Sequence, residues 1–257
     1  MGKFIISNNI ISSPTVTSRT EDSDYPDDNV NILTELHRKF MAADATMNDW
    51  LLKFNFAGAQ VATGILLDDV NFNKVKIQGH ASDSWGGPSY AGSDLTISQD
   101  ALTGRYRIYA ALTGFNYQYL RVFIPSGTAL TSGSVLSVGR IAILSASTAL
   151  SINPAEYERG VQEFYGENRT PAGLTRSVLS DYLQYWGELT FGARLESEET
   201  ELLTLSRMSQ ASPLVLFENR SVTNKAWVCY KSGNYSARFI DSDKIVGQSI
   251  RFEEIIN

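Results

Sequence analysis

Alternating apolar and polar positions fill much of the first half of the chain, a pattern typical of strands with one buried and one solvated face. The alternation runs through residues 74–78, 94–98, 105–108 and 118–124, whereas residues 135–144 are apolar almost throughout. The latter pattern predicts a strand that is covered on both faces. Gly- and Pro-containing turns separate these runs, at residues 86–88, 103–104, 113–114 and 125–127. Short strands at this spacing predict an antiparallel sandwich or jelly roll.

The N-terminal part of the chain has a different pattern. Residues 1–30 are polar with little apolar periodicity, and Pro26 favours an extended approach, so we expect an extended arm. Residues 31–43 carry apolar side chains near a helical period, which favours a helix. The aromatic-rich stretch 47–56 returns to a strand pattern.

A small, polar stretch at residues 145–154 ends in proline and indicates a boundary between two units. Beyond it, apolar and polar residues alternate through residues 183–191. Ser197, the acidic residues after it and apolar residues at helical spacing up to Met208 predict a helix with a serine N-cap. Strand-like runs follow Pro213.

The predicted fold class is therefore mainly β, with two β-sandwich domains. An extended arm occupies residues 1–30, and a jelly-roll-like sandwich occupies residues 31–150. A small sandwich with one α-helix occupies residues 151–257.

Composition narrows the classes of function. The 257 residues carry a net charge of −6, which does not suit binding of duplex DNA. No run approaches the ~18 apolar residues of a membrane-spanning helix, and the first residues lack the pattern of a secretory signal peptide. The single cysteine, Cys229, leaves no internal disulfide or Cys-rich zinc site, and its apolar surroundings predict burial. We expect a soluble, acidic protein made inside a cell, with no nucleic acid as partner.

Catalytic and metal-binding patterns are sparse. Of the two histidines, His37 lies beside basic residues and fits a surface position, whereas His80 precedes Asp83 in a polar loop. A general base oriented by a carboxylate would use such a pair, but a strand-end histidine in a polar loop explains it more simply. Asp68 and Asp69 lack the spacing of a calcium loop, so we expect a solvated turn. These patterns predict no catalytic residue, no metal and no cofactor.

The loop 83–90 carries candidate ligand-binding side chains. Asp83, Trp85 and Tyr90 stand among serines and glycines at one end of the predicted sandwich. A flat aromatic face beside carboxylate and hydroxyl groups suits a sugar ring, which has an apolar C–H face and a hydroxyl edge. The alternative is that these aromatic residues pack on their own domain or on a neighbouring subunit.

Residues 68–80, which lead into the Trp85 loop, resemble a strand and loop of the galactose-binding-like jelly-roll modules of bacteriophage tail proteins. The strand at 117–124, the apolar run at 138–144 and the lead-in at 25–29 are similar to these modules too. The second unit resembles the ring-forming domain of distal tail proteins. The matching segments are an aromatic strand, an acid-headed helix, a Pro-x-x-x-Phe strand and a closing strand, at residues 182–191, 198–208, 213–217 and 249–256.

This resemblance implies a non-enzymatic structural virion protein of a phage tail, in the baseplate or tail tip. Its implied partners are other tail proteins and further copies of itself, and its implied location is the virion, after synthesis in the bacterial cytoplasm. The 12 Tyr, 12 Phe and 4 Trp suit such interfaces. Tyr182 and Trp186 are candidate assembly residues because they lie on the opposite strand face from Leu183 and Leu189. The helix at 198–208 could instead cover them within the monomer.

Two functions of other classes stay open. One is a receptor-binding tail module that recognises host-surface glycans through Asp83, Trp85 and Tyr90. The other is a glycosidase or esterase, which would need a cleft with paired carboxylates or an activated hydroxyl. The sequence carries no signature of the tail peptidoglycan hydrolases.

Overall fold

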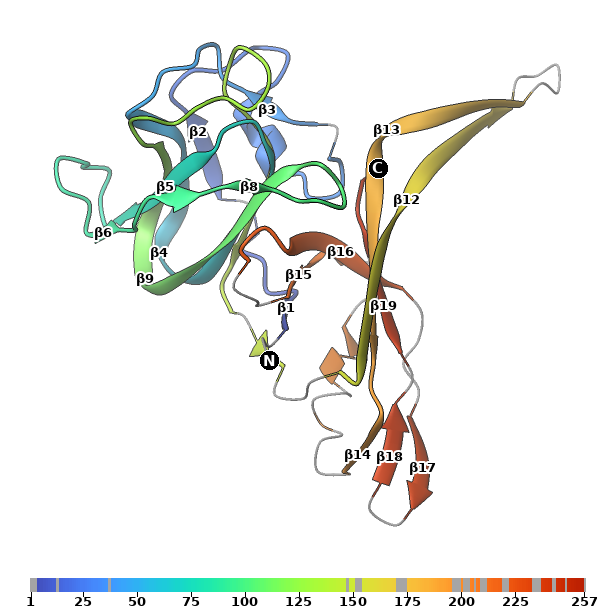
Figure 1. Cartoon of the computed structure of the whole chain (residues 1–257). Coiled ribbons are helices and arrows are strands. Elements are labelled where there is room, and N and C mark those ends of the chain that lie inside the picture. Colours follow the sequence, from blue (N-terminus) through green and yellow to red (C-terminus); the bar gives the residue numbers. More distant parts are fainter. Residues whose placement is uncertain are drawn as a thin grey trace.

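The computed structural model confirms the mainly β class, because its regular structure is almost entirely antiparallel strand, arranged in three sheets among the described residues (Figure 1). It describes the chain apart from residues 1–3, 13, 37, 147, 151–153, 170–174, 196–199, 201–203, 206, 209–211, 219–221, 233–236, 242–243, 248 and 257.

The strands fall into a nine-stranded, a seven-stranded and a three-stranded sheet. The first holds β2 (Thr15–Ser18), β3 (Phe40–Met41), β4 (Asp49–Val70), β5 (Lys74–His80), β6 (Tyr90–Ala91), β7 (Leu95–Thr96), β8 (Ser98–Gln99), β9 (Tyr106–Ile124) and β10 (Ser137–Leu144). The second runs, in spatial order, β11 (Thr148–Ala149), β1 (Ile5–Ser7), β15 (Leu214–Phe217), β16 (Ala226–Ser232), β19 (Ile250–Glu254), β13 (Thr175–Thr190) and β12 (Glu156–Arg169). The third runs β14 (Ala193–Leu195), β18 (Lys244–Gly247) and β17 (Ala237–Asp241).

Two long strands, β4 with 22 residues and β9 with 19, build the first unit as a sandwich. They pair along most of their length, and a register shift between Asn55 and Gln60 of β4 bends the pair. The first half of β4 and the second half of β9, with β2, β5, β6 and β7, form what we call the front layer. Their other halves, with β3, β8 and β10, form the back layer. Phe54 and Leu120 of the front layer join Ile108 of the back layer in one buried core.

The seven-stranded sheet of the second unit covers the back layer. Leu66, Tyr109 and Ala142 of the back layer share a buried cluster with Val215 and Phe217. The rings of Tyr109 and Phe217 stack with centroids 4.3 Å apart. All eight residues of β10 are buried, so the prediction that this strand is covered on both faces is confirmed.

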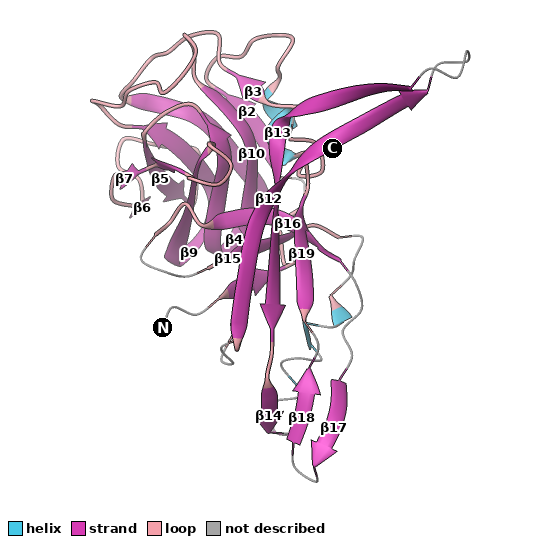
Figure 2. Cartoon of the chain, turned by 45° about the vertical axis from the view of Figure 1, so that its right-hand side comes forward, coloured by secondary structure: helices cyan, strands magenta, loops and turns pink. Residues whose placement is uncertain are grey.

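The other face of the seven-stranded sheet holds a second core. Tyr185 and Leu189 are buried there with Trp227 and Phe252, which confirms the alternation predicted along residues 183–191. The β12–β13 pair continues past β19 as a two-stranded ribbon that projects from the rest of the molecule (Figures 1 and 2).

Two local predictions for the first unit are wrong. Residues 31–43 do not form an α-helix: a short 3₁₀ helix, η1 (Asp27–Asn31), comes first, and the described residues after it form turns and β3. The apolar residues Leu36 and Phe40 are nevertheless buried, so their spacing serves an irregular segment that seals the sandwich. The predicted turn at residues 113–114 lies inside β9, where Gly114 has a φ of 74°.

Two further predictions concern the helix at residues 198–208 and the N-terminal arm. Much of the predicted helix 198–208 lies outside the described residues, but Thr200, Thr204, Leu205 and Arg207 have helical backbone. The N-terminal arm contributes a strand to each large sheet, because β1 pairs with β15 and β2 pairs with β4.

Candidate functional site

The outer face of the front layer carries polar and aromatic side chains from three neighbouring strands. Leu52, Phe54 and Val122 are buried in the core, so the residues that alternate with them point away from it. Three cross-strand rows of β4, β9 and β5 result: Trp50, Phe123 and Lys76; Lys53, Arg121 and Gln78; Asn55, Tyr119 and His80. Hydrogen-bonding groups and flat rings thus share one face.

The loop after β5 folds over the middle row. The Asp83 carboxylate accepts hydrogen bonds of 2.6 Å from Lys53 Nζ and of 2.6 Å from Trp85 Nε1. The guanidinium carbon of Arg121 lies 4.2 Å from the centre of the Trp85 ring. The half-buried indole is therefore held both at its nitrogen and across one face.

Arg121 is also close to a second aromatic ring, because its guanidinium carbon is 5.4 Å from the centre of the Phe123 ring. Its Nε donates a hydrogen bond to Gln78 Oε1. Burial lowers the pKa of Arg121, and Asp49 and Asp83 counteract this without forming an ion pair with it. The charged form of Asp83 is favoured instead, because the hydrogen bond from Lys53 lowers the pKa of its carboxyl.

His80 does not form the pair with Asp83 that a general base would need. Its Nδ1 lies 3.0 Å from the backbone nitrogen of Ser82 and 2.6 Å from the Ser82 carbonyl oxygen. Asp83 is engaged by Lys53 and Trp85 instead. The simpler interpretation, a strand-end histidine in a polar loop, fits this arrangement.

The structure brings Asp83 and Trp85 together but places Tyr90 elsewhere. Tyr90 pairs with Gly79, which pairs with the core residue Leu120, so Tyr90 lies on the inner face of the front layer. Its ring meets that of Phe115 edge-on at 5.4 Å. There it lines a cleft of about 350 Å³ that also includes Thr223 of the second unit.

The two candidate assembly residues lie in the second unit. Trp186 is half-buried on the strand face opposite Tyr185, as predicted, and its ring lies 5.0 Å from the Arg251 guanidinium. It also lies over Gly160 of β12, where an added Cβ would come within 2.9 Å of the indole. The side chain of Tyr182 lies outside the described residues. The assembly role of both residues stays a prediction.

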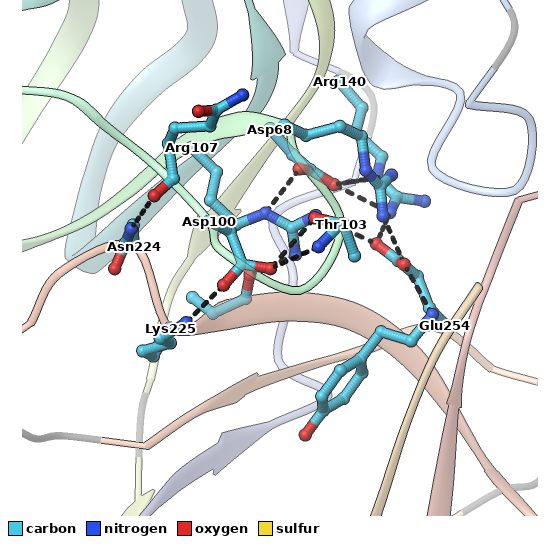
Figure 3. Close-up of polar contacts among 12 residues, drawn as sticks. Asp68, Asp100, Thr103, Arg107, Arg140, Asn224, Lys225 and Glu254 are labelled. Atoms are coloured by element: carbon cyan, nitrogen blue, oxygen red, sulfur yellow. Dashed lines mark hydrogen bonds and ion pairs between the residues drawn. The ribbon is translucent and has the colours of Figure 1, made fainter. Parts of the chain in front are cut away.

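Sequence reasoning missed a buried ionic cluster between the two units, which Figure 3 shows. We call Asp68, Arg105, Arg107, Arg140 and Glu254 the joint cluster. Arg140 Nη2 lies 2.8 Å from Asp68 and 3.1 Å from Glu254, and Arg107 Nε lies 3.1 Å from Asp68. Arg105 forms an ion pair with Glu254 as well. Because Glu254 belongs to β19, Arg105 to the loop before β9 and the other three residues to the back layer, these contacts join the units.

The expectation that Asp68 lies in a solvated turn is wrong, because its side chain is fully buried. Burial alone would raise the pKa of Asp68, but the guanidiniums of Arg107, Arg140 and Arg105 outweigh it and hold the pKa far below its ordinary value. Arg140 could have indicated this cluster from the sequence, because a single arginine in a strand that is covered on both faces needs a buried carboxylate as its partner.

Other chemistry on the described part of the chain is limited. It contains no group of three or more His, Cys, Asp or Glu side chains placed to hold a metal ion. Cys229 is buried as predicted, and burial raises the pKa of its thiol. Among the described residues, no helix is long and apolar enough to span a bilayer.

Comparisons with known proteins find similarities in structure only. No family model and no curated protein matches the sequence. A CBM32 module from a family 31 glycoside hydrolase of Clostridium perfringens overlaps with a TM-score of 0.42 and 10% identity, over 53% of this chain and 96% of that one. The lectin domain of lectinolysin, solved with Lewis B antigen, has a TM-score of 0.37 and 12% identity, over 54% and 96%. A fucose-binding module of Streptococcus pneumoniae has a TM-score of 0.34 and 12% identity, over 52% and 94%. With overlaps this low, the function has to be argued from the site.

Proposed function

We propose that this protein binds carbohydrate on the outer face of the front layer, with Trp85 as the platform for a sugar ring. The observation that carries the proposal is the fixed position of the Trp85 indole, which is held by Asp83 at its nitrogen and by Arg121 across one face. A preorganised ring loses little conformational entropy when a ligand stacks on it.

The polar groups around Trp85 can form hydrogen bonds with the hydroxyl groups of a sugar. Asp83 accepts hydrogen bonds, and Lys53 and Arg121 donate them, so both hydroxyl hydrogens and hydroxyl oxygens of a ligand find partners. The aromatic rings of Trp50 and Tyr119 in the flanking rows extend the surface beyond one ring.

The test is a glycan array probed with the intact chain and with Trp85→Ala. Losing the platform should weaken binding by about 30-fold, the effect of removing a central tryptophan from a binding site. Trp186→Ala is the matched control, because it removes the other half-buried tryptophan that contacts an arginine, in the second unit. An intact chain that binds no glycan, or equal loss with both variants, would contradict the proposal.

We further propose that the protein binds glycan without cleaving it and that it does so as part of a phage tail. The resemblance of residues 25–257 to tail proteins supports this setting, and the absence of a recognisable catalytic pattern in the sequence supports binding without turnover. Mass spectrometry of purified virions should then detect the chain, and a reducing-sugar assay on any bound glycan should show no release. Absence from virions would remove the tail setting and leave glycan binding intact.

A further inference from the structure

Within the part of the chain that the structure describes, one cation in the middle row of the outer face forms no ion pair with an acidic residue. Lys53 and Arg121 lie directly opposite each other on β4 and β9, where like charges repel. Asp83 forms an ion pair with Lys53, and Asp94 forms one with Lys76 at 2.8 Å. On the described residues, Arg121 forms no ion pair, and its only hydrogen bond leaves through Nε to the neutral amide of Gln78.

The orientation of Arg121 leaves its terminal nitrogens for a ligand. Trp85 covers the guanidinium and Phe123 lies beside it, and Nε is occupied by Gln78. Neither Nη1 nor Nη2 has a hydrogen-bond partner among the described residues. A planar guanidinium fixed in this way presents two parallel N–H groups, which match the two oxygens of a carboxylate.

The net charge of the protein bears on whether Arg121 could attract an anionic ligand. The chain has a net charge of −6, so general attraction of anions is not expected, and an anionic ligand has to be attracted locally. The guanidinium carbon of Arg121 lies 4.2 Å from the centre of the Trp85 ring and covers one of its faces, so a sugar stacks on the other face. The terminal nitrogens of Arg121 are then reached past the edge of the indole, by a neighbouring sugar of the same glycan.

We propose that the glycan is acidic, and that Arg121 binds the carboxylate of a uronic or sialic acid residue while a neighbouring sugar of the same glycan stacks on the free face of Trp85. This inference rests on the proposed function and names the class of sugar. A charge-assisted pair of hydrogen bonds should favour the acidic sugar over its neutral counterpart by about tenfold or more.

The experiment compares binding of oligogalacturonate and of sialyllactose with their carboxyl-reduced counterparts, in which each carboxylate has become a primary alcohol. Arg121→Met removes the charge but keeps an apolar side chain beneath Trp85, so the preference should vanish while neutral glycan still binds. Gln78→Glu should also abolish the preference, because it supplies an internal carboxylate to Arg121.

Arg251→Met is the matched control, since it changes the net charge equally but removes an arginine that contacts Trp186 and pairs with Glu253 in the second unit, and it should keep the preference. Equal binding of acidic and reduced glycans by the intact chain would overturn the inference and leave the proposed function standing. Equal binding of sulfated counterparts would overturn the assignment to a carboxylate. Binding of no glycan at all would overturn both proposals.

Discussion

An arginine contacts a tryptophan at two places in this molecule, with opposite consequences. In the joint between the units, Arg107 lies 5.6 Å from the Trp227 ring, and both side chains are fully buried. On the outer face of the front layer, Arg121 lies 4.2 Å from the Trp85 ring, and both are only half-buried. The residue types are the same, but the surroundings differ.

The difference shows that burial decides how many partners a charged side chain needs within the protein. Arg107 contacts carboxylates of Asp68 and Glu254 and donates a 3.0 Å hydrogen bond to the Ala226 carbonyl oxygen, because a buried charge without partners would be costly. Arg121 reaches water and can leave two nitrogens unpaired. The joint cluster therefore uses its arginines to hold the units together, whereas Arg121 keeps its terminal nitrogens available for the proposed ligand.

The largest expected effect comes from breaking the joint. Glu254→Gln removes one of the two carboxylates of the joint cluster, which contacts all three buried guanidiniums, so the free energy of unfolding should fall by about 3 kcal/mol or more. Urea unfolding measures this. Glu253→Gln is the control, since the Glu253 carboxylate is partly exposed and forms an ion pair with Arg251 on the surface, and the loss should stay within about 1 kcal/mol. Similar losses in both variants would mean that the joint cluster does not stabilise the fold.

A second effect follows from the lowered pKa of Asp68. Burial opposes this lowering and the three guanidiniums cause it, so the folded protein binds its proton only at lower pH than the unfolded chain. Stability from Asp68 is thus fully present above its ordinary pKa, and it is lost as the pH falls from about 4 toward the lowered folded value. Asp68 alone contributes a slope of at most about 1.4 kcal/mol per pH unit.

The measurement is urea unfolding at a series of pH values with the intact chain and Asp68→Asn. The variant should be less stable at neutral pH and should show a shallower decline below pH 4. A decline of equal steepness would show that Asp68 does not carry this dependence.

The outer face should respond in binding more than in stability. Asp83→Ala removes the acceptor of Trp85 Nε1 and the partner of Lys53, so glycan binding should weaken about five- to tenfold. Stability should change by less than about 1 kcal/mol, because the pair is exposed. Tryptophan fluorescence should shift to longer wavelength as the indole loosens. Asp94→Ala, which breaks only the ion pair with Lys76, should leave binding and fluorescence unchanged.

The smallest effect is expected at Trp186, whose Arg251 contact lies on a half-buried strand face. Trp186→Ala should cost about 1 kcal/mol of stability or less and leave glycan binding unchanged. If Trp186 also contributes to assembly, sedimentation velocity should show a smaller oligomer for this variant than for the intact chain. An unchanged oligomeric state would refute the predicted assembly role of this residue.

Much of the fold was predictable because alternation is local. The burial of Tyr185 and Leu189 and the complete burial of β10 follow from patterns that the sequence shows directly. The same local information misassigned residues 31–43, where Leu36 and Phe40 stand at helical spacing in an irregular segment. It also divided β9 at Gly114, because a glycine that permits a bend resembles one that ends a strand.

The candidate site was predictable only in part. Sequence reasoning identified Asp83 and Trp85 as members of one polar, aromatic loop, but it grouped Tyr90 with them, and strand pairing places Tyr90 on the opposite face. It could not identify Lys53 and Arg121, which come from strands separated from this loop by some thirty residues or more.

By itself, the sequence determined the strand-rich class, the buried faces and the presence of an aromatic, polar loop, because each depends on residues close together along the chain. Only the tertiary structure decided that Asp68, Arg107 and Arg140 are buried while Arg121 is not. The physical reason is that the solvation of a charged side chain depends on what covers its strand. Glu254 of β19, more than a hundred residues along the chain, lies against Arg107 and Arg140 of the back layer. On the front layer, the described residue that lies over Arg121 is Trp85 of an exposed loop.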